Sequence, residues 1–404
     1  MPPLWPLALL GAGLVGVVLW DAFETIILPR RVTRRIRLTR LFYLATWRPW
    51  SALGRRLPPS ARREGYLSFY GPLSLILLLG VWAIGLIFGF GLLEVGLGSQ
   101  LVGPEGPVSF WTIVYASGSN FFTLGIGDVT PRNPIGRALV ILEAGTGLAF
   151  LALVVGYVPV LYQAFSRREV YVSLLDARAG SPPSAGELLQ RYAVSDDPAA
   201  LGQILRDWEL WAADILESHL SYPLLVYYRS QHEAQSWLAA LTTILDASAL
   251  ILAVVDGVPR RPAELAFAMA RHTAADLSHL FRTAPRPPPA DRLPAADLVR
   301  LRAALEGVGL HLHERTGADE RLRKLRGLYE PYVSALADYL LMPLPAWLPS
   351  AEAVDAWQVT AWGVAEGLSS RWPGPAPDAA PAEPPPSAAA DSSASTEYPP
   401  RMHS

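Results

Sequence analysis

The sequence predicts an all-helical membrane protein with a further helical region outside the membrane. Of its 404 residues, 51% are hydrophobic and 17% are charged, well below the roughly 25% charged residues of typical soluble domains. The apolar residues concentrate in residues 1–165, where three stretches reach the roughly 20 residues that span a bilayer. From residue 166 onward the chain changes to amphipathic segments of helical period, which Pro- and Gly-containing breaks separate.

The first apolar stretch, within residues 1–28, predicts an uncleaved transmembrane helix. No Lys or Arg precedes its apolar run and no small-residue cleavage site follows it, so a signal peptide is not favoured. The stretch contains "GAGLVG" (Gly11, Gly13, Gly16), which matches the glycine spacing of dinucleotide sites. That interpretation lacks a βαβ unit and a following acidic residue. Small residues for close helix packing are the better explanation.

The linker at 29–66 is strongly basic. Eleven arginines lie between Arg30 and Arg63, and the next acidic residue is Glu64. By the positive-inside rule this linker is cytoplasmic. We therefore expect a protein of the plasma membrane with its N-terminus outside and its C-terminal half in the cytoplasm. The aromatic and basic run "LFYLATWRPWSALGRRL" predicts a helix on the inner leaflet, in contact with anionic lipids.

An alternative for the linker is a voltage-sensing helix. Arginines recur at every third position from residue 31 to residue 40, as such a helix requires. A sensor also needs apolar residues between its charges over a spanning length and acidic partners on neighbouring helices. Because the apolar residues are few here, an interfacial helix is the preferred interpretation.

Between the second and third apolar stretches lies a segment that predicts a re-entrant half-helix. Ser109 is a helix-start signal, and Phe110 to Asn120 is too short to span a membrane. The "TLGIGD" that follows is then non-helical backbone at membrane depth. Such backbone is tolerated only where it lines a water-filled path or is buried in protein. An ordinary turn is the alternative, but a turn needs no half-helix before it.

The chemistry of "TLGIGD" suits a dehydrated cation. Gly125 and Gly127 permit positive φ, so successive carbonyl groups can face one axis, and the Thr123 hydroxyl adds another oxygen. A ring of such strands would replace the water shell of a cation. The preceding half-helix points the negative end of its dipole toward the membrane centre, which also favours a cation there.

The segment "FFTLGIGDVTP" resembles the pore signature of potassium channels, T-x-G-[YF]-G-D. The resemblance covers roughly residues 67–165 as outer helix, pore helix, filter and inner helix, and it implies a homotetramer that conducts K⁺ passively. Asp128 would lie on the extracellular rim. The resemblance implies that the filter that binds the permeating K⁺ is formed by Thr123, Leu124, Gly125, Ile126 and Gly127.

Of two residues near the filter, one departs from the family pattern and one agrees with it. Ile126 stands where the family usually has Tyr or Phe, so bracing of the filter must come from packing alone. A weakly selective cation channel is therefore an alternative. Tyr115 stands where family members often have an aromatic residue that contacts the rim. We predict a hydrogen bond between Tyr115 and Asp128.

The third apolar stretch carries candidate gating residues. Gly147 lies at the distance from Asp128 where potassium channels have a hinge glycine, and Pro159 removes a helix hydrogen bond near the cytoplasmic mouth. The glycines could instead be close-packing positions. Glu143 is an acid within a spanning helix, which marks it as functional by default. It either adds charge to the cavity or, as we prefer, hydrogen-bonds the back of the pore helix.

Residues 166–372 predict a helical cytoplasmic domain whose ligand the sequence does not identify. The expected helices are 185–194, 198–222, 232–255, 262–282, 294–313 and 317–341. The apolar segment 236–255 is expected to be a buried core helix, with a fourth membrane span as the alternative. Residues 373–404 are rich in Pro, Ala and Ser and are expected to be disordered.

Several function classes are disfavoured by the composition. The net charge of −2 gives no sign of nucleic-acid binding. Cysteine is absent, and no paired acid and base, nucleophile or cofactor motif stands out, so we expect neither an enzyme nor a bound cofactor. A non-conducting membrane sensor, in which the helical domain is the active part, is the second alternative function.

Overall fold

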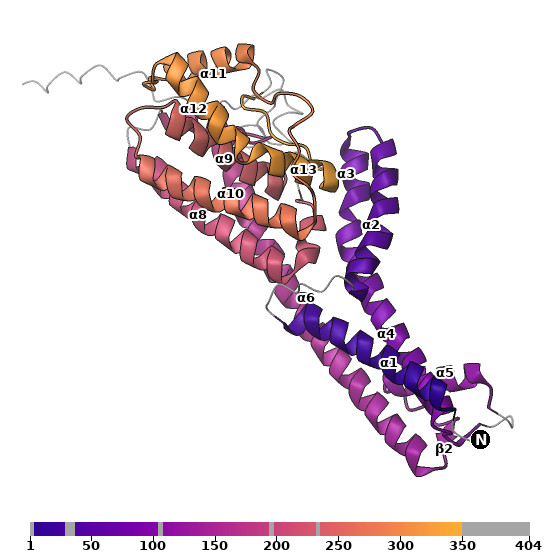
Figure 1. Cartoon of the computed structure of the whole chain (residues 1–404). Helices are drawn as coiled ribbons and strands as arrows, with labels where there is room; N and C mark the ends of the chain where they lie inside the picture. Colours follow the sequence, from indigo (N-terminus) through magenta and orange to yellow (C-terminus); the bar gives the residue numbers. More distant parts are fainter. Residues whose placement is uncertain (1–3, 29–36, 104–107, 194–197, 232–234, 350–404) are drawn as a thin grey trace, which may run out of the picture. The chain divides into compact units, whose positions relative to one another are not determined.

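The computed structural model describes residues 4–28, 37–103, 108–193, 198–231 and 235–349 (Figure 1). The predictions made for residues 30–36 and for the tail 373–404 concern residues outside these described ranges. The described part is almost entirely helical, with a single two-stranded pairing of β1 (Leu101–Val102) and β2 (Thr130–Pro131). Three of its helices are long and apolar enough to cross a membrane.

The first of these helices, α1 (Trp5–Ala22), packs along the second, α4 (Tyr70–Gly96). Glycines let the two backbones approach closely: a Cβ on Gly11 would lie 2.6 Å from the Gly89 carbonyl oxygen, and one on Gly96 would lie 2.2 Å from the Ala8 nitrogen. The packing interpretation of "GAGLVG" is therefore confirmed for Gly11. α1 ends in a π-helical turn, Phe23–Ile27.

The basic linker forms two helices, α2 (Leu38–Arg56) and α3 (Ala61–Ser68), which contact each other before the chain enters α4. The expected placement of the aromatic residues of α2 on a lipid surface is wrong for Trp47. Its side chain is 3% exposed, and its ring lies 4.7 Å from that of Tyr70 and 4.9 Å from that of Tyr227. Trp50 stacks on Tyr66 at 4.6 Å. Protein rings, rather than lipid, cover this face of α2.

The re-entrant segment forms a short helix, α5 (Phe110–Phe121), close to the expected bounds. The Ser109 hydroxyl accepts a hydrogen bond from the Thr112 amide at 3.2 Å, so Ser109 is the N-cap, as predicted. On the other side of the loop, Asn133 caps the next helix and also connects the segment before β1 with the segment after β2. Its Oδ1 accepts from the amides of Gly136 and Gln100, and its Nδ2 donates to the Gly98 carbonyl.

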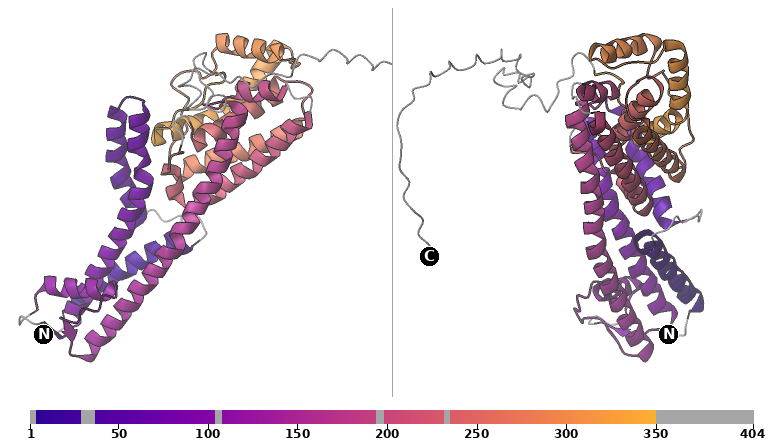
Figure 2. Two further views of the ribbon diagram at one scale, coloured as in Figure 1. Left: turned by 180° about the vertical axis from the view of Figure 1, so that it is seen from behind. Right: turned by 90° about the vertical axis from the view of Figure 1, so that its left-hand side faces the viewer.

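The third long helix, α6 (Pro134–Ala179), continues well past the expected boundary at residue 165. Figure 2 shows it as one uninterrupted helix, with Pro159 inside. Its 46 residues correspond to about 70 Å, against a hydrocarbon core of about 30 Å. Arg168, Val172, Leu175 and Ala179 recur at helical spacing and are buried. The last turns of α6 therefore pack against the C-terminal helical region, which we define as residues 180–349.

One buried arginine fastens α6 to that region. Arg168 is 1% exposed and donates to the carbonyls of Leu225 (2.8 Å) and Tyr228 (2.9 Å), in the segment after α8. Its Nη1 lies 3.3 Å from Nε2 of His219, which is fully buried. Glu169 supplies the adjacent counter-charge at 2.9 Å.

Most of the C-terminal helical region consists of helices around one buried helix, α9. The helices are α7 (Ala185–Ala193), α8 (Pro198–Ser221), a 3₁₀ turn (Pro223–Tyr227), α9 (Trp237–Ala253), α10 (Arg260–Leu280), α11 (Ala295–Gly307), α12 (Arg315–Gly327) and α13 (Glu330–Leu340). Every residue of α9 is buried, which confirms the core-helix interpretation. The expected single helix 317–341 is wrong, because α12 ends at Gly327 and α13 begins at Glu330. Pro331 is tolerated in the first turn of a helix but not in its interior.

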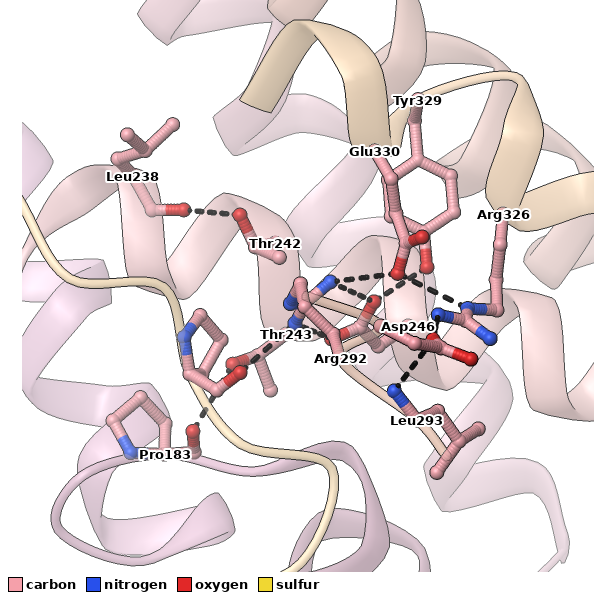
Figure 3. Close-up of polar contacts among 12 residues, drawn as sticks. Pro183, Leu238, Thr242, Thr243, Asp246, Arg292, Leu293, Arg326, Tyr329 and Glu330 are labelled. Carbon is pink, nitrogen blue, oxygen red and sulfur yellow. Dashed lines mark hydrogen bonds and ion pairs between the residues drawn. The ribbon is translucent and has the colours of Figure 1, made fainter. Parts of the chain in front are cut away.

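A charged network lies inside this region (Figure 3). Asp246 of α9 is fully buried and accepts from Arg292 Nη2 at 2.6 Å and from the Tyr329 hydroxyl at 2.5 Å. Arg292 also contacts Glu330 at 3.2 Å, and Arg326 contacts Glu330 at 3.0 Å. Burial opposes the charge on Arg292, but Asp246 beside it raises the pKa of that guanidinium. The carboxylate of Asp246, within the apolar segment 236–255, is thus neutralised by protein groups.

Candidate functional site

In residues 123–127, every second residue has a positive φ, so the backbone alternates between left-handed and other conformations. Thr123, Gly125 and Gly127 have φ of 56°, 62° and 76°, whereas Leu124 and Ile126 are not among the residues with positive φ. The positive values at both glycines are as expected from the sequence. The value at Thr123 was not foreseen, and it is an uncommon conformation for a residue with a Cβ. A chain that changes hand at every residue can turn consecutive carbonyl groups toward one side, which regular strands do not.

The carboxyl end of α5 holds the start of this segment. The amides of Phe122, Thr123 and Leu124 donate to the carbonyls of Gly118 (3.0 Å), Asn120 (3.0 Å) and Ser119 (2.8 Å). These bonds use carbonyls that a helix end otherwise leaves unpaired. The half-helix and the segment after it are thereby one structural unit.

In a single chain this segment is uncovered. Residues 122–128 are all exposed, and the side chains of Leu124 and Ile126 are 64% and 55% exposed. The adjacent face of α6 is also exposed: the exposed fractions of Ile141, Leu148 and Val155 are 72%, 61% and 65%. Apolar side chains of this size at such exposure require lipid or further protein around them.

Glu143 lies behind the half-helix rather than apart from it. It is fully buried, and its Oε1 accepts a short hydrogen bond from the Ser117 hydroxyl. Ser117 is on α5 and is also 2.7 Å from the Ile87 carbonyl oxygen of α4. This is the contact that the preferred interpretation of Glu143 predicted. Glu94 of α4 is a second buried acid that interacts electrostatically with Glu143.

Gly147 is a position of close approach. A Cβ there would lie 1.8 Å from the Phe121 carbonyl oxygen, at the end of α5. Gly145 and Gly156 on the same helix have no described atom within 4 Å of such a Cβ. Of the two interpretations of the α6 glycines, this geometry favours close packing at Gly147. α6 remains helical through both Gly147 and Pro159.

At the end of the segment that leads to β2, Asp128 interacts with Tyr115 of α5. Asp128 acts electrostatically on the Tyr115 hydroxyl, which agrees with their proximity, while the hydrogen bond between them stays a prediction. Tyr115 is 45% exposed in the single chain.

Sequence reasoning missed an acidic pair at the other end of the membrane region. Asp21 is 3% exposed, and its Oδ2 accepts from the Thr39 amide, the Thr39 hydroxyl and Trp82 Nε1 at 3.0, 2.5 and 3.0 Å. Glu24 forms an ion pair with Arg37 at 3.3 Å. The signal available in the sequence was two acids at the end of an apolar helix, directly before a basic linker.

Comparison with known proteins identifies the class of this region. Residues 76–163 match the ion channel family, and this stretch, from α4 through most of the membrane part of α6, is an ion channel domain rather than an enzyme. The matched residues include the half-helix, the alternating segment and Glu143.

A bacterial membrane protein resembles a larger part of the chain. The uncharacterized membrane protein YdjJ of Bacillus subtilis (strain 168) is 26% identical over 241 residues, which are 58% of this chain and 68% of YdjJ. No solved structure matches the chain significantly. The chain is thus a membrane protein with three candidate spans and an ion channel domain, followed by a further helical region.

Proposed function

We propose that the chain is a subunit of a potassium channel that conducts K⁺ passively through residues 123–127. The observation that carries the proposal is the alternating hand of the backbone at these residues. Main-chain oxygens on one side of such a strand can replace the hydration of a permeating cation. The Thr123 hydroxyl adds an oxygen at the inner end, and Asp128 lies at the outer rim.

Conduction requires several copies around one axis, and we propose four. The exposed filter segment and the bare face of α6 in the single chain are the surfaces that such an assembly would use. Cyclic symmetry would place each filter strand at the axis. In this arrangement Glu143, Ser117 and Gly147 support the filter from behind, and the uninterrupted α6 connects the pore to the C-terminal helical region, with Pro159 near the inner mouth.

The proposed orientation follows the distribution of arginines. The linker at 29–66 would be cytoplasmic, together with the C-terminal helical region, and the N-terminus would be outside in the plasma membrane. Anionic lipids would then be available to the exposed arginines of the linker. This orientation puts β1, β2 and Asp128 on the extracellular side.

Flux through liposomes tests the proposal. Purified protein in liposomes with an outward K⁺ gradient should release K⁺, and Gly125→Ala should abolish that release because alanine is strained at a φ of 62°. Gly80→Ala is the matched control, since a Cβ at Gly80 has no described atom within 4 Å. Absent flux from the unaltered protein would instead favour the non-conducting sensor, and a monomer in mild detergent would contradict the tetramer.

A weakly selective cation channel is the second candidate, and Ile126 is the reason for it. Its aliphatic side chain cannot donate a hydrogen bond to brace the filter. Replacing K⁺ by Na⁺ on one side of a planar bilayer distinguishes the two candidates. A large shift of reversal potential indicates a potassium channel, and a shift near zero indicates weak selectivity.

A further inference from the structure

A large cavity lies outside the ion channel site, where α2 faces the C-terminal helical region. Its volume is about 950 Å³, near the upper end of the range for small-molecule sites. The walls are the π-helical turn after α1, one side of α2, part of α4, and the parts of α8, α10 and α13 that face them. The segment 281–286 after α10 closes one side.

The lining of the cavity is cationic although the chain as a whole is not. Six arginines line it against three carboxylates, Glu24, Asp276 and Asp338, whereas the whole chain has a net charge of −2. A concave surface with charges of one sign concentrates ligands of the opposite sign. The arginines of the lining are Arg37, Arg40, Arg48, Arg55, Arg282 and Arg286.

Half of these arginines form no side-chain hydrogen bond and no ion pair among the described residues, although Arg48 acts electrostatically on the Tyr339 hydroxyl. Arg37 is paired with Glu24 at 3.3 Å, and Arg55 with Asp338 at 2.9 Å. No side-chain hydrogen bond or ion pair to a described residue satisfies Arg48 on α2, or Arg282 and Arg286 on the opposite wall. Arginines without an ion pair among the described residues thus line both walls of the cavity, and all three are exposed. A guanidinium has the donor geometry for phosphate oxygens.

The rest of the lining is apolar and aromatic. Tyr43, Trp47, Tyr227, Phe281 and Tyr339 contribute rings, several of which pack on one another, such as Tyr43 on Tyr227 at 5.7 Å. From α4 come three apolar residues of a membrane-length helix, Leu75, Leu78 and Trp82. Hydroxyl groups of Ser51, Ser221 and Thr283 also line the space. A ligand would therefore meet an apolar wall, a cationic wall and a few hydrogen-bonding groups.

We propose that this cavity binds a phosphodiester anion. Its phosphate oxygens accept hydrogen bonds from Arg48, Arg282 and Arg286, and its apolar substituent packs toward Leu75 and Leu78. The other substituent meets the hydroxyl groups. A phospholipid headgroup and a soluble phosphodiester share this chemistry. The proposal does not depend on ion conduction, because the cavity lies apart from residues 123–127.

Calorimetric titration of the full-length protein in a neutral detergent tests the site. The probes are dioctanoyl phosphatidylglycerol, its soluble headgroup glycerophosphoglycerol, and dioctanoylglycerol, which lacks the phosphate. Phosphatidylglycerol, glycerophosphoglycerol or both should bind, and dioctanoylglycerol should not. The double variant Arg282→Gln/Arg286→Gln should bind about tenfold or more weakly, because two charge-assisted contacts are lost.

Controls separate the site from general charge effects. Arg271→Gln removes an exposed charge of α10 that does not line the cavity, and it should leave binding unchanged. Arg48→Gln, on the opposite wall, should weaken binding as the double variant does. Binding of phosphatidylglycerol alone identifies a lipid, and equal binding of glycerophosphoglycerol identifies a soluble ligand. Equal binding of all three probes, no binding of either phosphodiester, or equal losses with Arg271→Gln would overturn the proposal.

Discussion

The membrane part of α6 and the buried helix α9 are both apolar, but they meet different surroundings. In α6 the apolar side chains of Ile141, Leu148 and Val155 are more than half exposed, whereas no residue of α9 is exposed. α9 is covered on all sides by helices of its own chain. Among the described residues, the membrane part of α6 has protein on one side only, where the half-helix α5 and α4 pack against it.

The two surroundings tolerate different buried polar groups. Inside the C-terminal helical region, Asp246 is paired with an arginine from the same chain. Glu143, also fully buried, has a serine hydroxyl as its described hydrogen-bond partner and another acid, Glu94, nearby. A buried charge is tolerated in a protein core only when its partner is also present, because an unpaired buried charge is strongly destabilising. In the ion channel domain, by contrast, the buried acids Glu143 and Glu94 lie near residues 123–127, which are exposed in the single chain.

The largest effect is expected where the ion channel domain is packed most tightly. Gly147→Ala would place a methyl group 1.8 Å from the Phe121 carbonyl oxygen, so the end of α5 or α6 must move, and residues 123–127 with it. We expect K⁺ flux from liposomes to fall more than tenfold. Gly145→Ala, two residues away and without a described neighbour within 4 Å of the new atom, should keep most of the flux.

The same pair of variants tests the hinge alternative. If Gly147 served only as a hinge, alanine would stiffen α6 without displacing α5. The variant would then conduct with altered gating and unchanged thermal stability. That outcome would contradict the close-packing interpretation.

Sequence patterns predicted this domain well because its constraints are local. The helix start at Ser109 and the glycines at positions of positive φ are signalled by the residue itself. The positive φ of Thr123 has no such signal, because the surrounding structure imposes it. Gly147 could not be assigned from sequence either, since hinges and close contacts use the same residue.

The basic linker and the C-terminal helical region were harder to predict because their partners are distant in sequence. Trp47 looked like a residue for a lipid surface, but Tyr227, far along the chain, covers it. An aromatic and basic helix has the same sequence pattern whether membrane or protein covers its rings. Likewise, nothing near Asp246 reveals that Arg292 and Tyr329 will surround it.

A stability effect of intermediate size is expected in the C-terminal helical region. Arg292→Met removes the partner of Asp246 and leaves a buried carboxylate unpaired, which costs about 3–5 kcal/mol in free energy of unfolding. Arg300→Gln is the control, because its pair with Asp297 is exposed and contributes about 0.5 kcal/mol or less. Denaturant unfolding followed by circular dichroism measures both changes. Equal stability of the two variants would show that the network in Figure 3 is not a stabilising feature.

The smallest expected effect concerns His219, where α6 is fastened to the C-terminal helical region. Burial, and then the Arg168 guanidinium, lower the pKa of His219 well below its ordinary value. An unfolded histidine takes up a proton below about pH 6.5, and the folded one does not. The stability due to neutral His219 is therefore complete above pH 6.5 and decreases as the pH falls, by at most about 1.4 kcal/mol per pH unit.

Melting temperatures between pH 5 and pH 7.5 measure this contribution. His219→Gln should make the decline below pH 6.5 shallower, because glutamine keeps a polar side chain without a titrating proton. His279→Gln, at an exposed position of α10, should leave the slope as it is. An identical slope in all three proteins would mean that His219 is protonated in the folded state or open to solvent. The joint between α6 and the C-terminal helical region would then be less closed than Arg168 and its carbonyl partners indicate.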